Sequence, residues 1–237
     1  MDPESGRELA LEQALRRTRH ALIQTVHAVS AMVAHRDPYT ARHQRRTASV
    51  ALGIGRQLGL GADQLEGLYL GALVHDLGKI AIPSDLLSKP ARLTPEEFGL
   101  VKTHVQVGCD ILQNVELPWP VHAIVAQHHE RLDGSGYPKG LTASAIVIEA
   151  RIVAVADVFQ AMSDDRPYRA ALGCDAVLQE LERGARVTFD AEVIRGLRAV
   201  LAAKPSASGG ELWSALESEE AQSSTVILPS LPLSRTP

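Results

Sequence analysis

Apolar side chains recur at helical spacing along most of the chain, and polar or turn-forming residues separate the apolar stretches. Intervals of three, four and seven residues between apolar positions are typical of one buried face of an α-helix. The pattern predicts helices over about residues 8–35, 38–58, 62–75, 94–113, 118–129, 143–163, 174–184 and 190–203.

Capping residues mark the ends of several predicted helices. Asp37 followed by Pro38 suits an N-cap and a first helical position, and Gly59 suits the end of that helix. Residues 94–97, Thr-Pro-Glu-Glu, form a capping-box pattern with proline at the first helical position. Asp190 is placed to cap the last predicted helix.

Four segments are expected to lie outside the long helices. Residues 80–88 contain Pro83 and predict a connecting loop. Residues 130–140 combine glycines, a proline and an Asp-Gly pair, which predicts a structured loop. Residues 166–169 break the preceding helix, and residues 204–237 are rich in Ser, Pro, Gly and Glu, which predicts a largely disordered tail.

The chain therefore divides into an N-terminal helix, residues 1–35, a central domain, residues 36–203, and the tail. The apolar stripe of the first helix has two interpretations. It could pack on the core of its own chain, or it could pair with a second copy as a coiled coil and make a homodimer.

Composition narrows the function classes. Aromatic residues are only 4% of an otherwise aliphatic chain, which favours helices over a β-sandwich. A net charge of −4 provides no basic footprint for a nucleic-acid polymer, so local cations or a metal must hold an anionic substrate. No apolar run approaches a membrane span, and residues 1–9 have no apolar signal core. Two distant cysteines, Cys109 and Cys174, argue against a disulfide scaffold or zinc ribbon and fit a cytoplasmic location.

His75-Asp76-Leu77-Gly78-Lys79 follows an apolar run over residues 68–74 and carries the first chemical signal. Burying a histidine and an aspartate without partners is costly, whereas a metal ion at the helix end could take both. The same residues also suit an ordinary helix C-terminus, because cations favour its negative dipole end and glycine favours the position beyond it. The pentapeptide alone leaves both interpretations open.

Histidines and aspartates on other predicted helices favour the metal. The full set at helix ends or apolar faces is His43, His75, Asp76, His104, His128, His129 and Asp157. One such histidine is usually satisfied within a core, but seven groups in an aliphatic core would each need a partner. Seven ligands suit two ions that share a carboxylate. Imidazole and carboxylate ligands suit Fe, Mn, Zn or Ni, and paired ions are a standard arrangement for phosphoester hydrolysis.

These residues resemble a known family. The His75-Asp76 pair, with His43 and Asp157, resembles the HD superfamily of metal-dependent phosphohydrolases. Residues 128–138, His-His-Glu-Arg-Leu-Asp-Gly-Ser-Gly-Tyr-Pro, resemble the signature of its HD-GYP branch. The resemblance covers about residues 20–200. It implies an all-α fold, an HD-domain helical bundle with additional helices. It also implies hydrolysis of cyclic di-GMP to linear pGpG or GMP in bacterial second-messenger signalling, with two divalent ions, Fe or Mn.

The resemblance implies a role for each site residue. One metal ion would be bound by His43, His75, Asp76 and Asp157, and the second by Asp76, His104, His128 and His129. Asp76 would bridge the ions, and Lys79 would lie near the scissile phosphate, which makes both catalytic. The substrate would be bound by Lys79, Gly134, Gly136, Tyr137, Pro138, Gln160, Arg166 and Arg169. The loop that contains Tyr137 is also thought, in this family, to contact diguanylate cyclase (GGDEF) domains.

Two positions depart from the family pattern. Tyr39 stands where some relatives have a glutamate that helps to hold a third metal, which favours two ions here. Gln160 stands where many relatives have aspartate, so a neutral amide replaces an anion near the substrate. Two alternatives to the phosphodiesterase stay open. One is a binding or protein-interaction module that has lost turnover, and the other is an HD hydrolase of another cyclic dinucleotide or nucleotide. The complete ligand set favours the active enzyme.

Overall fold

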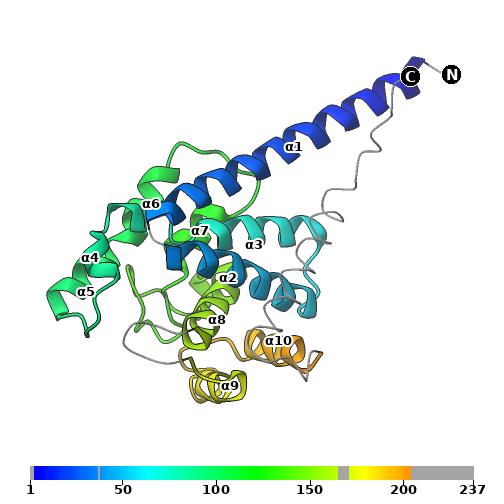
Figure 1. Ribbon diagram of the computed structural model, residues 1–237. Coiled ribbons are helices and arrows are strands. Elements are labelled where there is room, and N and C mark those ends of the chain that lie inside the picture. The colour runs from blue at the N-terminus through cyan, green and yellow to red at the C-terminus, as the bar shows by residue number, and fades with distance from the viewer. Residues whose placement is uncertain (1–2, 37, 165–170, 204–237) are drawn as a thin grey trace.

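The computed structural model describes residues 3–36, 38–164 and 171–203, apart from the side chains of residues 3–5, 34–36 and 38–41. Over these residues the chain is helical and forms no strand, so the predicted all-α fold is confirmed. The elements are α1 (Pro3–Arg36), α2 (Pro38–Gln57), α3 (Ala62–Val74), η1 (Leu77–Ala81), α4 (Ser84–Leu87), α5 (Pro95–Lys102), α6 (His104–Leu112), α7 (Val121–Gln127), η2 (Ala143–Ala145), α8 (Ile148–Ser163), α9 (Cys174–Arg183) and α10 (Ala191–Ala202) (Figure 1).

The sequence placed most helices correctly and missed three details. The segment 80–88, predicted as a loop, contains the end of η1 and the single turn α4. The helix predicted over residues 94–113 is divided at Thr103 into α5 and α6. There the hydroxyl and the N–H of Thr103 both bond to the carbonyl of Leu100, which tightens the turn and interrupts the α-helix. The helix predicted from residue 143 begins instead at Ile148, after the short 3₁₀ turn η2.

The predicted caps are observed wherever the structure describes them. Thr94 and Glu97 form the reciprocal capping box at the start of α5, and Asp190 accepts a bond from the N–H of Glu192 at the start of α10. Gly59 ends the segment after α2 with a φ of 75°. The predicted capping role of Asp37 and the predicted tail, residues 204–237, lie outside the described residues.

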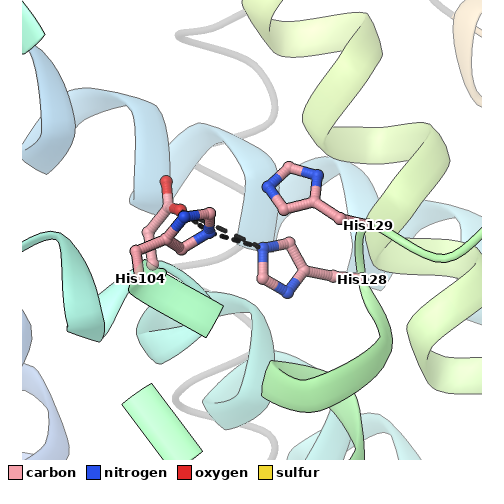
Figure 2. Close-up of side chains that lie close together, drawn as sticks. His104, His128 and His129 are labelled. Atoms are coloured by element: carbon pink, nitrogen blue, oxygen red, sulfur yellow. Dashed lines mark hydrogen bonds and ion pairs between the residues drawn. The ribbon is translucent and has the colours of Figure 1, made fainter. Parts of the chain in front are cut away.

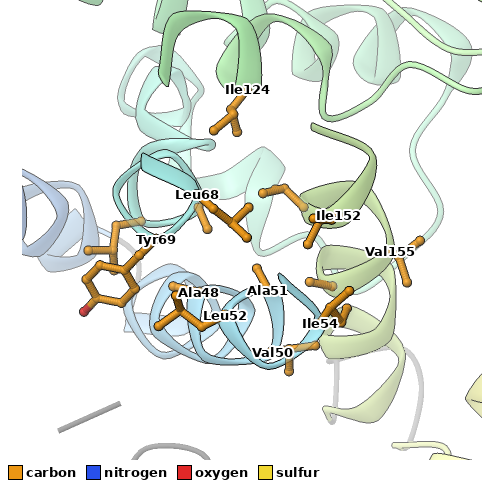
Figure 3. Packing of buried hydrophobic residues seen from close by; sticks show 14 of the residues in the cluster. Ala48, Val50, Ala51, Leu52, Ile54, Leu68, Tyr69, Ile124, Ile152 and Val155 are labelled. Atoms are coloured by element: carbon orange, nitrogen blue, oxygen red, sulfur yellow. The ribbon is translucent and has the colours of Figure 1, made fainter. Parts of the chain in front are cut away.

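The hydrophobic core lies between α2, α3, α7 and α8 (Figure 3). Ala48 and Ala51 of α2 face Leu68 of α3, and Ile152 of α8 closes the other side. All four side chains are fully buried. Because α2, α3, α7 and α8 pack on this one aliphatic core, the histidines and aspartates at their ends and on their inner faces come to a common place.

The helix α1 is both docked and protruding. In its C-terminal half Ile23 is buried, and the hydroxyl of Ser30 donates to Gln44 of α2 and to the carbonyl of Leu73. Arg19 clamps the helix to α3, since its Nε lies 2.6 Å from the buried carboxylate of Glu66. The N-terminal half extends beyond the other helices (Figure 1), and its leucines are exposed. Packing on its own core therefore accounts for only part of the apolar stripe.

The 3₁₀ segment η1 packs against the backbone of α6, and Gly78 makes this contact possible. A Cβ atom on Gly78 would lie 1.9 Å from the carbonyl oxygen of His104 and 2.5 Å from the amide nitrogen of Gly108. Gly78 does not have a positive φ, so glycine is required there by the close backbone approach and not by a left-handed turn. This contact fixes α6, and with it His104, against the residues that follow Asp76.

Gly78→Ala tests this contact. The added methyl group must move the α6 backbone, so we expect the variant to lower the free energy of unfolding by about 3 kcal/mol, as severe overpacking does. Urea denaturation of the metal-free protein would measure the loss. Gly99→Ala on α5 is the matched control, because nothing lies within 4 Å of its added Cβ. That control should leave stability unchanged or raise it by up to about 1 kcal/mol. Equal stabilities of the two variants would contradict the assignment.

Candidate metal centre

The structure brings all seven predicted ligand residues into one cluster. They come from α2 (His43), the end of α3 (His75 and Asp76), the start of α6 (His104), the end of α7 (His128 and His129) and α8 (Asp157). Their ligand atoms fall into two groups, and within each group all ligand atoms lie within 4.8 Å of one another. The first group is His43, His75 and Asp157, and the second is Asp76, His104, His128 and His129. Figure 2 shows the imidazoles of three members of the second group turned toward one another.

Asp76 lies between the two groups. Its Oδ2 is 3.3 Å from Nε2 of His75 and 3.7 Å from Nε2 of His43. Its Oδ1 is 3.4 Å from Nε2 of His104 and 4.0 Å from Nε2 of His128. Each carboxylate oxygen therefore faces a different set of imidazoles, which is the arrangement that a carboxylate shared by two ions requires.

The end of α3 allows the adjacent residues His75 and Asp76 to face the same centre. Within a helix, neighbouring side chains point about 100° apart. The helix ends at Val74, His75 is its C-cap, and Asp76 has left helical geometry with φ −99° and ψ 13°. Because the backbone changes direction between them, the side chains of His75 and Asp76 can face the same centre. The pentapeptide is thus both a helix end and part of the cluster.

Three of the imidazoles are oriented by the helices that carry them. Nδ1 of His75 bonds to the carbonyl of Ala72 at 2.7 Å. In the same way His104 bonds to Val101 at 2.6 Å, and His128 bonds to Val125 at 2.9 Å. A carbonyl oxygen only accepts, so in each ring Nδ1 carries the proton and Nε2 offers its lone pair to the cluster. Such a bond on the outer nitrogen is typical of metal-bound histidine.

Buried atoms in the cluster indicate that cations belong there. Within the described part of the chain, Nε2 of His75 and Oδ1 of Asp76 are buried without a hydrogen-bond partner. Leaving such atoms unsatisfied costs free energy that metal coordination would recover. The residues therefore fit divalent metal binding, with His43, His75, Asp76 and Asp157 able to hold one ion and Asp76, His104, His128 and His129 able to hold another.

The protonation states suit the same role. Burial lowers the pKa of His104 and His128, and it lowers the pKa of His129 to about 3, so these three imidazoles stay neutral near pH 7. Burial opposes ionisation of Asp76, but the Lys79 ammonium and the His75 imidazole keep its pKa well below the usual range. His75 is the exception. Burial lowers its pKa, but the neighbouring carboxylates of Asp76 and Asp157 outweigh this effect, and the pKa is raised overall. A proton on His75 would therefore compete with a metal ion.

Comparison with known proteins identifies the family to which the chain belongs. A family model described as HD domain matches residues 27–193. The chain belongs to the HD-domain family. The resemblance drawn from the sequence is thereby confirmed.

Two curated relatives and one solved structure illustrate the similarity. The chain is 39% identical over 197 residues to the cyclic di-GMP phosphodiesterase response regulator RpfG of Xanthomonas campestris pv. campestris, covering 81% of this chain and 52% of RpfG. It is 39% identical over 140 residues to 3'3'-cGAMP-specific phosphodiesterase 1 of Vibrio cholerae serotype O1, covering 59% of this chain and 32% of that protein. The chain thus spans about half of the length of RpfG and about a third of that of the relative from Vibrio cholerae. Bd1817, an HDG"Y"P protein from Bdellovibrio bacteriovorus, shares the fold with a TM-score of 0.58 and 23% identity over 68% of this chain and 53% of its own.

Lys79 extends from η1 to the HD-domain cluster. Its Nζ donates to Oδ2 of Asp76 at 2.6 Å, and about a quarter of its side chain is exposed. The ammonium therefore lies at the solvent-facing side of the carboxylate that joins the two ligand groups. The role expected for Lys79 beside a bound phosphate stays a prediction.

The loop at residues 130–140 is closed by a buried carboxylate that the sequence argument passed over. Glu130 is buried, and its two oxygens accept bonds from the N–H groups of Lys139 at 2.8 Å and Leu141 at 2.9 Å. Gly136 passes so close to the backbone of residues 129–131 that an added Cβ would lie 2.4 Å from the amide nitrogen of Arg131. The signal for Glu130 was present in the sequence, because a carboxylate directly after two expected metal ligands on an apolar helix needs donors of its own.

This closure places Tyr137 beside the cluster. Its ring stacks on the imidazole of His129 with centroids 4.6 Å apart. Gly134 adopts a φ of 80°, which glycine tolerates, and Pro138 follows Tyr137 in the turn. These residues fix the shape of the loop, and their contact with a substrate stays a prediction. Arg166 and Arg169, predicted to contact phosphate, lie outside the described residues.

Gln160 has a different setting from the one predicted. Its side chain is fully buried, and both ends of its amide are bonded to protein groups, so it is not available to a substrate in this structure. Its Nε2 lies 2.5 Å from Oδ2 of Asp164, and its Oε1 meets Nδ1 of His43. Because the Asp164 carboxylate accepts only, the amide must donate to Asp164 and present its oxygen to His43. His43 then carries its proton on Nδ1 and directs Nε2 to the cluster.

The contact forms part of a closed ring of bonds between two helices. Nη1 of Arg46, one turn after His43 on α2, donates to Oδ1 of Asp164 at 2.7 Å. Gln160 and Asp164 are likewise one turn apart at the end of α8 and just beyond it. The ring fixes the orientation of the Gln160 amide, and through it the orientation of His43. Gln160 is therefore a positioning residue for one expected ligand.

No helix among the described residues is long and apolar enough to cross a membrane.

Gln160→Ala tests the positioning role. Loss of the acceptor leaves Nδ1 of His43 without its partner, and outer bonds of this kind typically change metal affinity by about 10- to 100-fold. We expect a loss of this size at one of two sites, measured by Mn²⁺ titration calorimetry of metal-free protein. Gln106→Ala, at an exposed position of α6, is the control and should bind as wild type does. Unchanged affinity at both sites in Gln160→Ala would contradict the role.

Proposed function

We propose that the protein is a metal-dependent phosphodiesterase that hydrolyses cyclic di-GMP to linear pGpG, to GMP or to both, through a dinuclear His/Asp site. The observation that carries the proposal is the placement of Asp76, whose two oxygens face two separate groups of ligand atoms. The relatedness to RpfG, which is named a cyclic di-GMP phosphodiesterase, supports the choice of substrate.

Each part of the site has a defined task in this proposal. Two divalent ions, when bound, would hold the phosphodiester, promote attack by water and offset the developing negative charge. Asp76 positions both ions, and Lys79 stabilises charge on the phosphate or assists the leaving oxygen. Arg166 and Arg169 are proposed to bind phosphate as bidentate donors. Gly134, Gly136, Tyr137 and Pro138 shape the loop against which the substrate lies.

Iron or manganese is the proposed metal. The ligand atoms are imidazole nitrogens and carboxylate oxygens, and neither cysteine belongs to the two described ligand groups. Imidazole and carboxylate donors suit Fe²⁺, Mn²⁺ and Zn²⁺ and do not suit iron–sulfur chemistry, and the resemblance to the HD-GYP branch favours iron or manganese among these metals. Metal analysis of protein purified without oxygen would test this, and retention of zinc alone after supply of all three metals would contradict it.

We also propose that the protein is cytoplasmic, where both of its cysteines would stay reduced.

A first proposed protein partner is a GGDEF domain, which the loop that contains Tyr137 would contact. Exposed Lys139 on this loop offers a test, because Lys139→Glu should weaken capture of a purified GGDEF domain if the loop is the contact. Capture that is equally strong in the variant would contradict the contact.

A homodimer through α1 is the second proposed assembly. Leu9, Leu11 and Leu15 are 56%, 72% and 66% exposed, and burial of such leucines against a second copy would stabilise a pair of helices. We expect the double change Leu11→Glu and Leu15→Glu to convert a dimer to a monomer in sedimentation equilibrium. The exposed alanine substitutions Glu12→Ala and Arg16→Ala are the matched control on the same turns. A wild-type monomer at high concentration would contradict the dimer.

The function itself is tested by turnover of cyclic di-GMP by protein reconstituted with Fe²⁺ or Mn²⁺ without oxygen. We expect two metal ions per chain and a linear or monomeric product. Asp76→Asn should reduce kcat at least about 1,000-fold, because removal of the shared carboxylate disrupts both proposed ion sites. Asp110→Asn, at an exposed position of α6, is the control and should retain wild-type turnover. Normal turnover by Asp76→Asn would refute the mechanism.

The same assay separates the alternatives. The relative from Vibrio cholerae is named for 3'3'-cGAMP, so 3'3'-cGAMP and cyclic di-AMP belong in the substrate panel. Hydrolysis of one of these with cyclic di-GMP untouched would establish an HD hydrolase of another cyclic dinucleotide. Two bound metals and tight cyclic di-GMP binding without product would establish a binding module.

A further inference from the structure

The helix α5 contributes no buried residue to the core, yet it places an aromatic and a cationic side chain beside the candidate site. Phe98 and Lys102 are four residues apart and so lie on one face of the helix. Phe98 is 44% exposed. The exposed part of this aromatic side chain lies beside the candidate site and offers an apolar surface to a ligand.

The rings form a continuous series that begins at the metal cluster. The Tyr137 ring stacks on His129 with centroids 4.6 Å apart. The Phe98 ring meets Tyr137 edge to face, with centroids 6.2 Å apart and planes at 84°. Phe98 is thus one ring further from the proposed metal ligands than Tyr137, on the side that is open to solvent.

Lys102 adds a positive charge to this series. Its Nζ lies 4.7 Å from the centroid of Phe98 and 5.3 Å from that of Tyr137, within the range of cation–π contact. No carboxylate pairs with Lys102 among the residues for which the structure gives contacts. Among these residues its charge has no competing carboxylate, and its ammonium lies against the same two rings.

The start of α5 is rigid, which suits a binding surface. Thr94 and Glu97 complete the capping box, and Lys89 holds Glu97 with its Nζ 2.7 Å from the carboxylate. A helix that is fixed before the ligand arrives loses less conformational entropy on binding.

We propose that Phe98 and Lys102 bind the substrate outside the metal cluster, with Phe98 stacking on a purine base and Lys102 contacting a phosphate that does not react. The inference rests on the proposed function for the identity of the substrate, a cyclic purine dinucleotide. Stacking on an exposed aromatic face is how proteins hold bases without reading their sequence, and a flanking cation is how they hold the backbone beside them. Phe98 and Lys102 are then substrate-binding residues that the HD-domain motifs do not include.

The test compares a ligand that carries a base with one that does not. Stacking typically contributes about 1–3 kcal/mol per base, so Phe98→Ala should raise the KM for cyclic di-GMP and the inhibition constant of GMP by about tenfold or more. The inhibition constant of inorganic phosphate, which has no base, should not change. Phe98→Trp should restore the affinity for GMP, and Leu100→Ala, at a position of the same helix that is 45% exposed, should behave as wild type. Equal weakening of GMP and phosphate, or no weakening of either, would overturn the proposal.

Lys102→Met has a separate signature. It should weaken cyclic di-GMP binding most at low ionic strength and reduce the dependence of that binding on salt, because one charge contact is lost. An unchanged salt dependence would overturn the role of Lys102.

A binding measurement tests the base site even if the proposed enzymatic function is wrong. If the metal-loaded protein hydrolyses no cyclic dinucleotide, equilibrium binding of GMP by calorimetry replaces the kinetic readout. Weaker GMP binding by Phe98→Ala than by wild type would still support the base site. Absence of GMP binding by the wild-type protein, or equal binding by both, would overturn it.

Discussion

The buried carboxylate of Asp76 is the constraint to which the rest of the structure is adapted. A carboxylate at 1% exposure requires positive or donating groups on both oxygens. Lys79 donates to Oδ2, whereas four imidazoles from α2, α3, α6 and α7 face the two oxygens with the lone pairs of Nε2, so cations held by the cluster would meet the rest of that need. Each helix end must therefore stop at a set distance from the same point. The close contact of Gly78 with α6 is one consequence, since a side chain there would move His104 away from Oδ1 of Asp76.

The outer nitrogens of the histidines show how the fold orients a cluster without dedicated side chains. His75, His104 and His128 each use the carbonyl three residues earlier on their own helix or helix end. Helix ends offer such carbonyls because the last ones have no intrahelical donor. His43 lies inside α2, where the carbonyls are taken by the helix itself, and it uses a side chain of α8 instead. The position of each histidine along its helix thus determines whether a partner such as Gln160 is needed.

Local signals in the sequence predicted the local parts of the fold. The Thr94–Glu97 box, Gly59 and Asp190 act through bonds to near neighbours, so their roles could be predicted without tertiary information. The seven residues of the cluster could be predicted because a polar group on an apolar helix face needs a partner wherever the chain places it. Their assembly into two groups around Asp76 agrees with that reasoning.

The parts that the sequence argument missed depend on contacts between distant segments. The family resemblance implied that Gln160 binds the substrate, but the ring with Arg46 and Asp164 turns it toward His43. Phe98 and Lys102 carry no motif, and only the fold of residues 130–140 brings Tyr137 beside them. The difference between the residues that could be predicted and those that could not follows from their burial. The metal cluster is enclosed, so its residue types are restricted by electrostatics, whereas the outer surface of α5 can change with little effect on folding. Residues that select among substrates are therefore expected at such exposed positions next to the cluster, where a change alters contacts with the ligand and leaves the buried carboxylate and its imidazoles in place.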